Sequence, residues 1–252
     1  MVRTGNGESV ISRALRIFEA FSADDRTLRV SDIAARTGLH LATASRLVAE
    51  LVDHGLLARD ADRRVRIGVR LWELASRASP ALSLREAAMP FLEDLHAVVG
   101  HHVQLGVLDG REVLFLERLS APGAVINYTR IAGRLPLHVS SSGLVLLAHA
   151  PRELQESVLA GPLRAFTPHT ITTAARLRVT LAGIRKQGFV HCAGHIHEEA
   201  LGLAVPVFDP ARAVVAALSA IVPNDETGHA VVPVLMAAAR GVGRTLEGSR
   251  SR

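Results

Sequence analysis

The 252-residue sequence has a single cysteine, Cys192, and a single lysine, Lys186. One cysteine excludes a disulfide within the chain, which fits a reducing compartment. No apolar run reaches the roughly 20 residues that cross a bilayer, so no membrane association is expected. The opening stretch MVRTGNGES is polar and lacks the apolar core of a signal peptide. These absences together predict a cytoplasmic protein.

Acidic residues are also in the minority, because 24 Asp and Glu face 29 Lys and Arg, a formal net charge of +5. The surplus is spread over both halves of the chain, so charge alone supports a nucleic-acid partner only weakly. Local clustering is more informative, since Arg59 to Arg70 holds five arginines against Asp60 and Asp62. With 48% hydrophobic residues, the chain is long enough to bury a core in two globular domains.

Residues 30–57, VSDIAARTGLHLATASRLVAELVDHGLL, have the pattern of a helix-turn-helix. Apolar residues recur at helical spacing over 30–37 and again over 41–54. Ala34 is small where the two helices would cross, and Gly38 suits a turn that needs a positive φ. The residues expected to face the core are Ile33, Leu39, Ala44, Leu47 and Leu51. A plain helical hairpin, in which Gly38 only caps a helix, is the alternative interpretation.

Two short strands are expected at 56–59 and 65–67, around the polar tip DADRR, and would form a wing. In a winged helix-turn-helix the second helix enters the major groove of double-stranded DNA. The candidate DNA-binding residues on that helix and on the wing are His40, Ala42, Thr43, Ser45, Arg46, Arg63, Arg64 and Arg66. Arg46 can bond to a guanine edge or a phosphate, and the wing arginines suit phosphates or the minor groove.

The remainder of the chain has an α+β pattern. Asp109-Gly110 between two apolar stretches, 103–108 and 112–117, is a strong hairpin signal. The other elements expected from periodicity are strands at 125–129, 203–208 and 214–222 and helices at 143–150, 174–187 and 230–246. Neighbouring strands with helices between some of them favour a mostly antiparallel sheet with packed helices.

Several local signals predict where helices begin or bend. Ser31 and Ser142 are plausible N-caps, and Ser83 to Glu86 has the S-x-x-E form of a capping box. Pro90 is expected to kink or restart the helix that this box opens. Trp72 is expected to pack between the wing and that helix.

The stretch GFVHCAGHIHEEALG, residues 188–202, gathers three histidines, a cysteine and two glutamates. These residue types suit a metal site, a catalytic site or the wall of a binding pocket. A metal-dependent enzyme or a metal sensor that uses His191 to Glu199 is therefore one possible function of the chain, kept here as the alternative. Gly188 and Gly194 argue against a helix, so the i, i+4 spacing of His191 and His195 does not indicate zinc ligands. No metal or other cofactor is therefore expected. No G-x-S-x-G elbow accompanies the serines, so an enzyme is not expected either.

Four stretches together resemble the IclR family of bacterial transcription regulators over nearly the whole chain. They are RTGLHLATASRLVAELVDHGLLARD with RIGVRLWELA, LREAAMPFLEDL, GRLPLHVSSSGLVLLA, and GLAVPVFDPARAVVAALSA. The resemblance implies a DNA-binding domain at 1–76, a linker helix at 77–98 and an effector-binding and oligomerisation domain at 99–252. It also implies a homodimer or homotetramer whose effectors are small organic molecules, often carboxylates.

The chain departs from the family pattern in two places. The recognition helix begins with His40-Leu41-Ala42, where relatives commonly have Pro-Arg-Ser, so the helix lacks a strong N-cap and a basic residue. His195 stands where relatives often carry a glutamate.

A dimer would require a palindromic operator, because two-fold protein symmetry imposes two-fold symmetry on the site.

The stretch HVSSSGLVLLA predicts the effector class. Three serines and a glycine at the start of an apolar helix offer hydroxyls and unpartnered N–H groups, which together favour a carboxylate. The resemblance places the effector beside this helix, so a small organic acid, aromatic or not, is expected there. The candidate effector-binding residues are Leu137, His138, Ser140, Ser141, Ser142, Gly143, His191, Cys192, His195, Leu203 and Val205. In the plainer alternative one serine caps the helix and the others face water.

Overall fold

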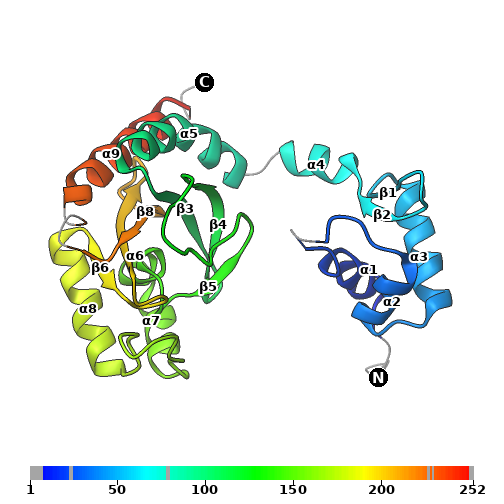
Figure 1. Ribbon diagram of the computed structural model, residues 1–252, viewed down its shortest axis with the longest axis horizontal. Coiled ribbons are helices and arrows are strands. Elements are labelled where there is room, and N and C mark those ends of the chain that lie inside the picture. The colour runs from blue at the N-terminus through cyan, green and yellow to red at the C-terminus, as the bar shows by residue number, and fades with distance from the viewer. Residues whose placement is uncertain (1–7, 23–24, 78–79, 226–227, 229, 250–252) are drawn as a thin grey trace. The chain divides into compact units, whose positions relative to one another are not determined.

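The computed structural model describes residues 8–22, 25–77, 80–225, 228 and 230–249. The chain divides into two compact units, Met1–Pro80 and Ala81–Arg252, and each is described by itself (Figure 1). The expectations for the first seven residues, and part of those for the 22–27 loop and the 75–83 linker, lie outside the described residues. None of the described helices is both long enough and apolar enough to span a membrane.

The first unit is a winged helix-turn-helix. Its elements are α1 (Val10–Glu19), α2 (Val30–Thr37), α3 (Leu41–Asp53), β1 (Leu57–Arg59), β2 (Val65–Ile67) and α4 (Val69–Ser76). Its core contains Ile17, Ile33, Leu47, Leu51 and Leu57, so three helices and the wing share one apolar cluster. The antiparallel pairing of β1 with β2 confirms the predicted wing.

Gly38 separates α2 from α3 with a φ of +66°, as the turn of a helix-turn-helix requires. The predicted N-cap Ser31 is wrong by two residues, because α2 begins after Arg29. The backbone N–H of Arg29 donates to Oδ2 of Asp32 at 3.1 Å, and Ser31 lies exposed inside the helix. Helix α3 begins after His40 without a side-chain cap, as predicted.

Helix α4 was not predicted, and it carries Trp72 on its surface. Trp72 is 66% exposed, so its own unit does not bury it, and its packing against the linker helix stays a prediction. No residue of α4 is buried.

The second unit begins with one continuous helix, α5 (Pro80–Val99). The predicted start at Ser83 is wrong, because Ser83 lies inside this helix, and Pro90 does not restart it. The buried residues Leu84, Ala88, Leu92 and Leu95 stand at helical spacing on both sides of the proline. Burial of this apolar stripe keeps the helix intact across the hydrogen bond that proline removes.

A six-stranded antiparallel sheet forms the centre of the second unit, in the order β5-β4-β3-β8-β7-β6. The strands are β3 (His102–Asp109), β4 (Glu112–Leu119), β5 (Arg134–Pro136), β6 (Val190–Ala193), β7 (Ala200–Phe208) and β8 (Val214–Pro223). The hairpin predicted at Asp109-Gly110 joins β3 to β4. The strand predicted at 125–129 is wrong, because this segment has no ladder partner.

Helices cover both faces of the sheet (Figure 1). On one face α6 (Ser141–His149), α7 (Arg152–Leu159) and α8 (Ala174–Gln187) belong to a cluster that includes Phe115, Leu144 and Cys192. On the other face α5 and α9 (Val231–Ser249) pack on Leu105, Leu203 and Val205. Successive side chains of a strand point to opposite faces, so the strand register decides which residues meet α6.

Candidate functional site

The outer face of α3 presents polar side chains on the surface of the first unit. His40, Ala42, Ser45 and Arg46 are exposed and Thr43 is half-buried. The guanidinium Nη1 of Arg46 lies 4.0 Å from the Glu50 carboxylate, and the Arg46 side chain is 65% exposed. Such a surface ion pair is worth well under about 1 kcal/mol, so it does not hold Arg46 away from a ligand.

The three wing arginines differ in their surroundings. Arg63 and Arg66 are exposed, whereas Arg64 is half-buried. The Nη2 of Arg64 donates to the backbone carbonyl of Thr27 at 3.1 Å, which ties the wing to the loop before α2. Arg64 therefore has a structural contact that Arg63 and Arg66 lack, and those two are the arginines that extend into solvent.

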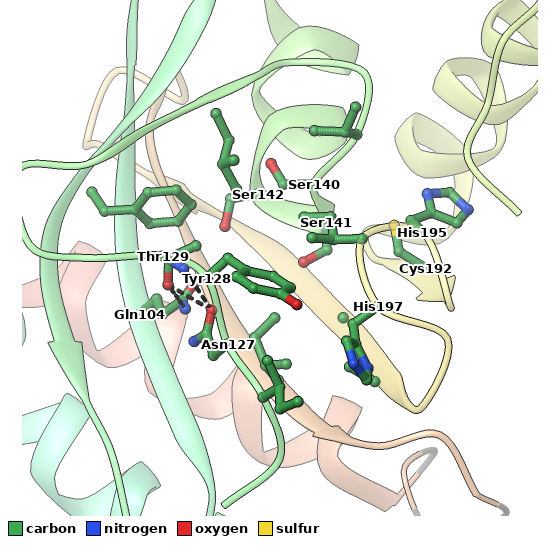
Figure 2. Close-up of a pocket in the computed structure, with 18 residues that line it drawn as sticks. Gln104, Asn127, Tyr128, Thr129, Ser140, Ser141, Ser142, Cys192, His195 and His197 are labelled. Atoms are coloured by element: carbon green, nitrogen blue, oxygen red, sulfur yellow. Dashed lines mark hydrogen bonds between the residues drawn. The ribbon is translucent and has the colours of Figure 1, made fainter. Parts of the chain in front are cut away.

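The second unit contains a cavity beside the start of α6, with about 490 Å³ of space between its walls, part of it open to solvent. Its lining comes from the sheet, from α6 and from two irregular segments, 120–133 and 194–199 (Figure 2). Its polar and thiol side chains are those of Gln104, Asn127, Tyr128, Thr129, Ser140, Ser141, Ser142, Cys192, His195 and His197. Apolar lining includes Phe115, Ile126, Leu135, Val139, Ile196 and Ile221. Among the residues that the structure describes, no Arg, Lys, Asp or Glu belongs to this lining.

The first turn of α6 borders this cavity. Ser140, not the predicted Ser142, is the N-cap, and its Oγ accepts from the N–H of Gly143 at 3.0 Å. The N–H groups of Ser141 and Ser142, which open the helix, have no carbonyl partner within it. A Cβ at Gly143 would lie 2.8 Å from the backbone carbon atoms of Leu137, so glycine is needed where the chain turns back on itself.

A chain of hydrogen bonds joins α6 to the 125–129 segment across the sheet. The Ser142 hydroxyl donates to Ser219 Oγ at 2.9 Å, and Ser219 donates to Gln104 Oε1 at 3.4 Å. Gln104 Nε2 donates to Thr129 Oγ1, and Thr129 Oγ1 donates to Asn127 Oδ1 at 2.8 Å. In place of a strand ladder, the 125–129 segment is held by the side chain of Gln104 on β3 and by the bond between Thr129 and Asn127.

The histidine-rich stretch forms β6 and a turn, and no helix, as its glycines predicted. Cys192 and His195 line the cavity, whereas His191 does not and packs on the ring of Phe189, with 5.2 Å between centroids. Burial raises the pKa of the Cys192 thiol, so the thiol stays protonated. Burial first, and then the charges of Arg176 and His169, lower the pKa of His195 to about 4. His195 is therefore neutral at pH 7.

In the described part of the chain, Nδ1 of His195 and Nδ1 of His197 are buried and have no hydrogen-bond partner. Asn127 Nδ2, on the opposite wall, is in the same condition. Buried polar atoms without partners are uncommon in folded proteins, and these three belong to the lining of one cavity. Among the described residues, no group of three His, Cys, Asp or Glu side chains is arranged to hold a metal.

Six of the predicted effector-binding residues lie outside the lining. Leu137 is core, Gly143 is buried inside α6, and His138 Nε2 lies 3.0 Å from the carbonyl of Arg164, with a pKa lowered by burial. Leu203 and Val205 face α5 and α9, and the alternation of side chains along β7 puts Ala200 and Gly202 on the cavity side instead. His191 is the sixth. Ser140, Ser141, Ser142, Cys192 and His195 are the five that the structure brings together.

Sequence reasoning missed Gln104, Asn127, Tyr128, Thr129 and His197. His197 belongs to the histidine-rich stretch, whereas the other four belong to no motif, and Gln104 and Thr129 come together through a hydrogen bond between distant segments. One signal was present, because Tyr128 is the only tyrosine of the chain.

Comparison with known proteins assigns both units. Residues 10–61 match the profile described as the IclR helix-turn-helix domain, and residues 77–246 match that of the bacterial transcriptional regulator IclR C-terminal. The HTH-type transcriptional regulator XynR of Escherichia coli is 31% identical over 83% of this chain and 84% of its own length.

Solved structures show the same fold. An IclR homologue from Microbacterium hydrocarbonoxydans, solved in complex with 4-hydroxybenzoate, is 45% identical, with a TM-score of 0.92 over 95% of this chain and 100% of that one. A transcriptional regulator from Rhodococcus sp. RHA1 is 26% identical, with a TM-score of 0.82 over 95% of this chain and 98% of its own.

Proposed function

Because this chain belongs to the IclR family of bacterial transcriptional regulators, we propose that it binds operator DNA under the control of an aromatic carboxylic acid held beside the start of α6. It is a transcriptional regulator with a helix-turn-helix domain and a C-terminal ligand-binding domain. The proposal adds the chemical class of the effector, the atoms that receive it and the symmetry of the DNA site.

The observation that carries the effector class is the open first turn of α6. Its first N–H groups, which have no carbonyl partner within the helix, and the Ser141 hydroxyl are donors at the positive end of a helix dipole, which suits a carboxylate. The Ser142 hydroxyl donates to Ser219 Oγ and would have to give up that bond to donate to the acid. Because the described part of the lining has no cationic side chain and His195 is neutral at pH 7, the start of α6 is the positive group that would receive a carboxylate. Apolar residues such as Phe115 and Ile221 suit the body of a ring. The complex of the 45% identical homologue with 4-hydroxybenzoate supports the same class.

The DNA half of the proposal rests on the exposed face of α3. Arg46 and its neighbours would contact base edges, and Arg63 and Arg66 would contact phosphates. One winged module covers few base pairs, so we propose a homodimer or homotetramer on a palindromic operator. In this arrangement residues 1–76 bind DNA, 77–98 connect, and 99–252 bind effector and oligomerise. The effector acts by favouring one placement of the paired DNA-binding domains over another.

Calorimetry tests the acid site with matched ligand pairs. Aromatic acids such as 4-hydroxybenzoate are titrated beside their amides, which keep the shape and lose the charge. The acid should bind more than tenfold more tightly, a difference of about 1.4 kcal/mol. The double variant Ser141→Ala, Ser142→Ala should lose most of that preference. Ser157→Ala, at an exposed position on α7, is the matched control.

Equal binding of acids and amides, or an unchanged preference in the double variant, would remove the helix terminus from the proposed site. The symmetry is tested separately, by footprinting and sedimentation. A monomer at micromolar concentration that still binds a single half-site tightly would contradict the palindromic operator.

A further inference from the structure

Tyr128 forms part of the cavity wall on the irregular 120–133 segment. Figure 2 shows its ring lying across the cavity, with the hydroxyl directed toward Ser141 and His197. The ring centroids of Tyr128 and His197 are 6.1 Å apart and tilted by 46°. The residue is 63% exposed, so much of its surface remains in water although it lines the cavity.

Hydrogen bonds hold the backbone on both sides of Tyr128. His102 Nε2 lies 2.6 Å from the carbonyl of Val125, and Arg118 donates to the carbonyl of Thr129. Gln104 holds the Thr129 hydroxyl, and Asn127 Oδ1 accepts from the N–H of Thr129 at 3.0 Å. Thr129 is thus bonded to side chains of β3 and β4, and Asn127 is bonded to Thr129. Among the described residues no hydrogen bond to the Tyr128 hydroxyl is formed.

The hydrogen-bonded backbone positions the Tyr128 ring at the cavity, and no hydrogen bond among the described residues engages its hydroxyl. The same bonded chain leads through Gln104 and Ser219 to Ser142 at the start of α6. A bound acid with its carboxylate at the start of α6 and its ring beside Tyr128 would therefore contact two ends of the same chain of hydrogen bonds. Few aromatic residues are available in this chain, at 4% of the sequence, and two of them, Phe115 and Tyr128, line the cavity.

We propose that Tyr128 determines the specificity of the cavity for flat aromatic rings, by packing its own ring against that of the bound acid. The proposal rests on the proposed function, since it assumes that an organic acid occupies this cavity. An aromatic pair in contact favours binding by about two- to tenfold beyond the effect of buried area. A saturated ring of the same size buries similar area but forms no such pair.

The experiment compares 4-hydroxybenzoate with trans-4-hydroxycyclohexanecarboxylate by calorimetry on the full chain. The wild-type protein should prefer the aromatic acid by at least threefold. Tyr128→Leu, which keeps an apolar side chain but removes the ring, should abolish that preference. Tyr128→Phe should retain it, because the ring remains. Ile131→Ala is the matched control, since Ile131 is 55% exposed on the same segment and lies outside the lining.

A second measurement needs no substitution, because Tyr128 is the only tyrosine. Protein labelled with ring-¹³C tyrosine gives one set of ring signals, all from this residue. The aromatic acid should shift these signals upfield through its ring current, and the saturated acid should not.

The outcomes separate the two proposals. If neither acid binds the wild-type protein, the proposed function fails. If both acids bind but Tyr128→Leu keeps the aromatic preference, or the tyrosine signals do not respond to the aromatic acid, the role of Tyr128 is overturned and the acid site remains.

Discussion

The two candidate binding surfaces of this chain are built in opposite ways. The DNA-binding face is a single turn-and-helix stretch whose side chains extend into solvent, as the 65% exposure of Arg46 shows. The effector cavity gathers side chains from strands, α6 and two irregular segments, and several of them hydrogen-bond to one another. Substitutions on the first surface should act independently, whereas those in the second should affect their neighbours as well.

The largest expected contrast lies between two glycines. An alanine at Gly143 would bring its Cβ within 2.8 Å of the Leu137 backbone, so Gly143→Ala should cost the second unit about 3 kcal/mol. Gly38 has nothing within 4 Å of such a Cβ and only a positive φ, so Gly38→Ala should cost the first unit about 1 kcal/mol. Hydrogen exchange followed by mass spectrometry measures the stability of each unit within the intact chain.

Gly183→Ala is the control, because Gly183 lies inside α8 with open space around it. That substitution should leave stability unchanged or raise it by up to about 1 kcal/mol. A loss at Gly143 no larger than the loss at Gly38 would show that the turn before α6 is not tightly packed.

The next largest difference between the two units is expected in how their stability depends on pH. Burial lowers the pKa of His195 to about 4, below the ordinary value of 6.5, so the unfolded chain binds more protons between these values. The second unit should therefore keep its full stability above pH 6.5 and lose about 2 kcal/mol as the pH falls to 4. The first unit contains only the exposed His40 and His54 and should change less.

The same hydrogen-exchange experiment, repeated at pH 7 and pH 4.5 with correction for intrinsic rates, measures this difference. His195→Gln removes the largest of these shifts and should reduce the pH dependence of the second unit, leaving the part that comes from His102 and His138, whose pKa values burial also lowers. A second unit as stable at pH 4.5 as at pH 7 would mean that His195 is protonated at little cost.

The DNA-binding surface comes from one local stretch and the cavity from distant segments, and this difference decides how much of each could be predicted from the sequence. The helix-turn-helix depends on neighbours in the chain, so the positions of Ala34, Gly38 and the apolar residues were enough to predict it. The hairpin at Asp109-Gly110 is local in the same sense. In the second unit, α6 was predicted, but its cap was placed at Ser142 and not at Ser140, because three adjacent serines look alike without their partners.

The rest of the cavity depends on contacts between distant segments. Leu203 and Val205 were expected in the pocket, yet a shift of one residue along β7 decides which face a side chain meets. The 125–129 segment has the apolar character of a strand but is held by His102 and Gln104, which no local pattern reveals. His197 and Tyr128 meet only because two irregular segments approach each other.

A smaller effect is expected at the DNA surface. Arg46→Ala should weaken binding to the preferred operator by about 1–2 kcal/mol and relax the preference at one base pair. Footprinting on operators with single-position changes measures both effects. Glu50→Gln is the control, because it removes only the weak ion pair with Arg46. An Arg46→Ala protein with unchanged affinity would show that α3 does not reach the bases through this residue.

The smallest expected effect is a difference between two neighbouring arginines of the wing. Arg63 is exposed and Arg64 donates to the Thr27 carbonyl at 3.1 Å, so the two neighbouring arginines should respond differently to the same substitution. Arg63→Ala should lower the salt dependence of DNA binding by about one counterion and leave the stability of the first unit unchanged. Arg64→Ala should leave that salt dependence nearly unchanged but cost the first unit about 1 kcal/mol, because it removes one of the hydrogen bonds between the wing and the segment before α2, leaving the two backbone bonds between Leu28 and Val65. Salt titrations of DNA binding, together with hydrogen exchange in residues 25–67, distinguish the two results. Equal salt effects from both variants would mean that Arg64 leaves Thr27 to bind phosphate when DNA is present.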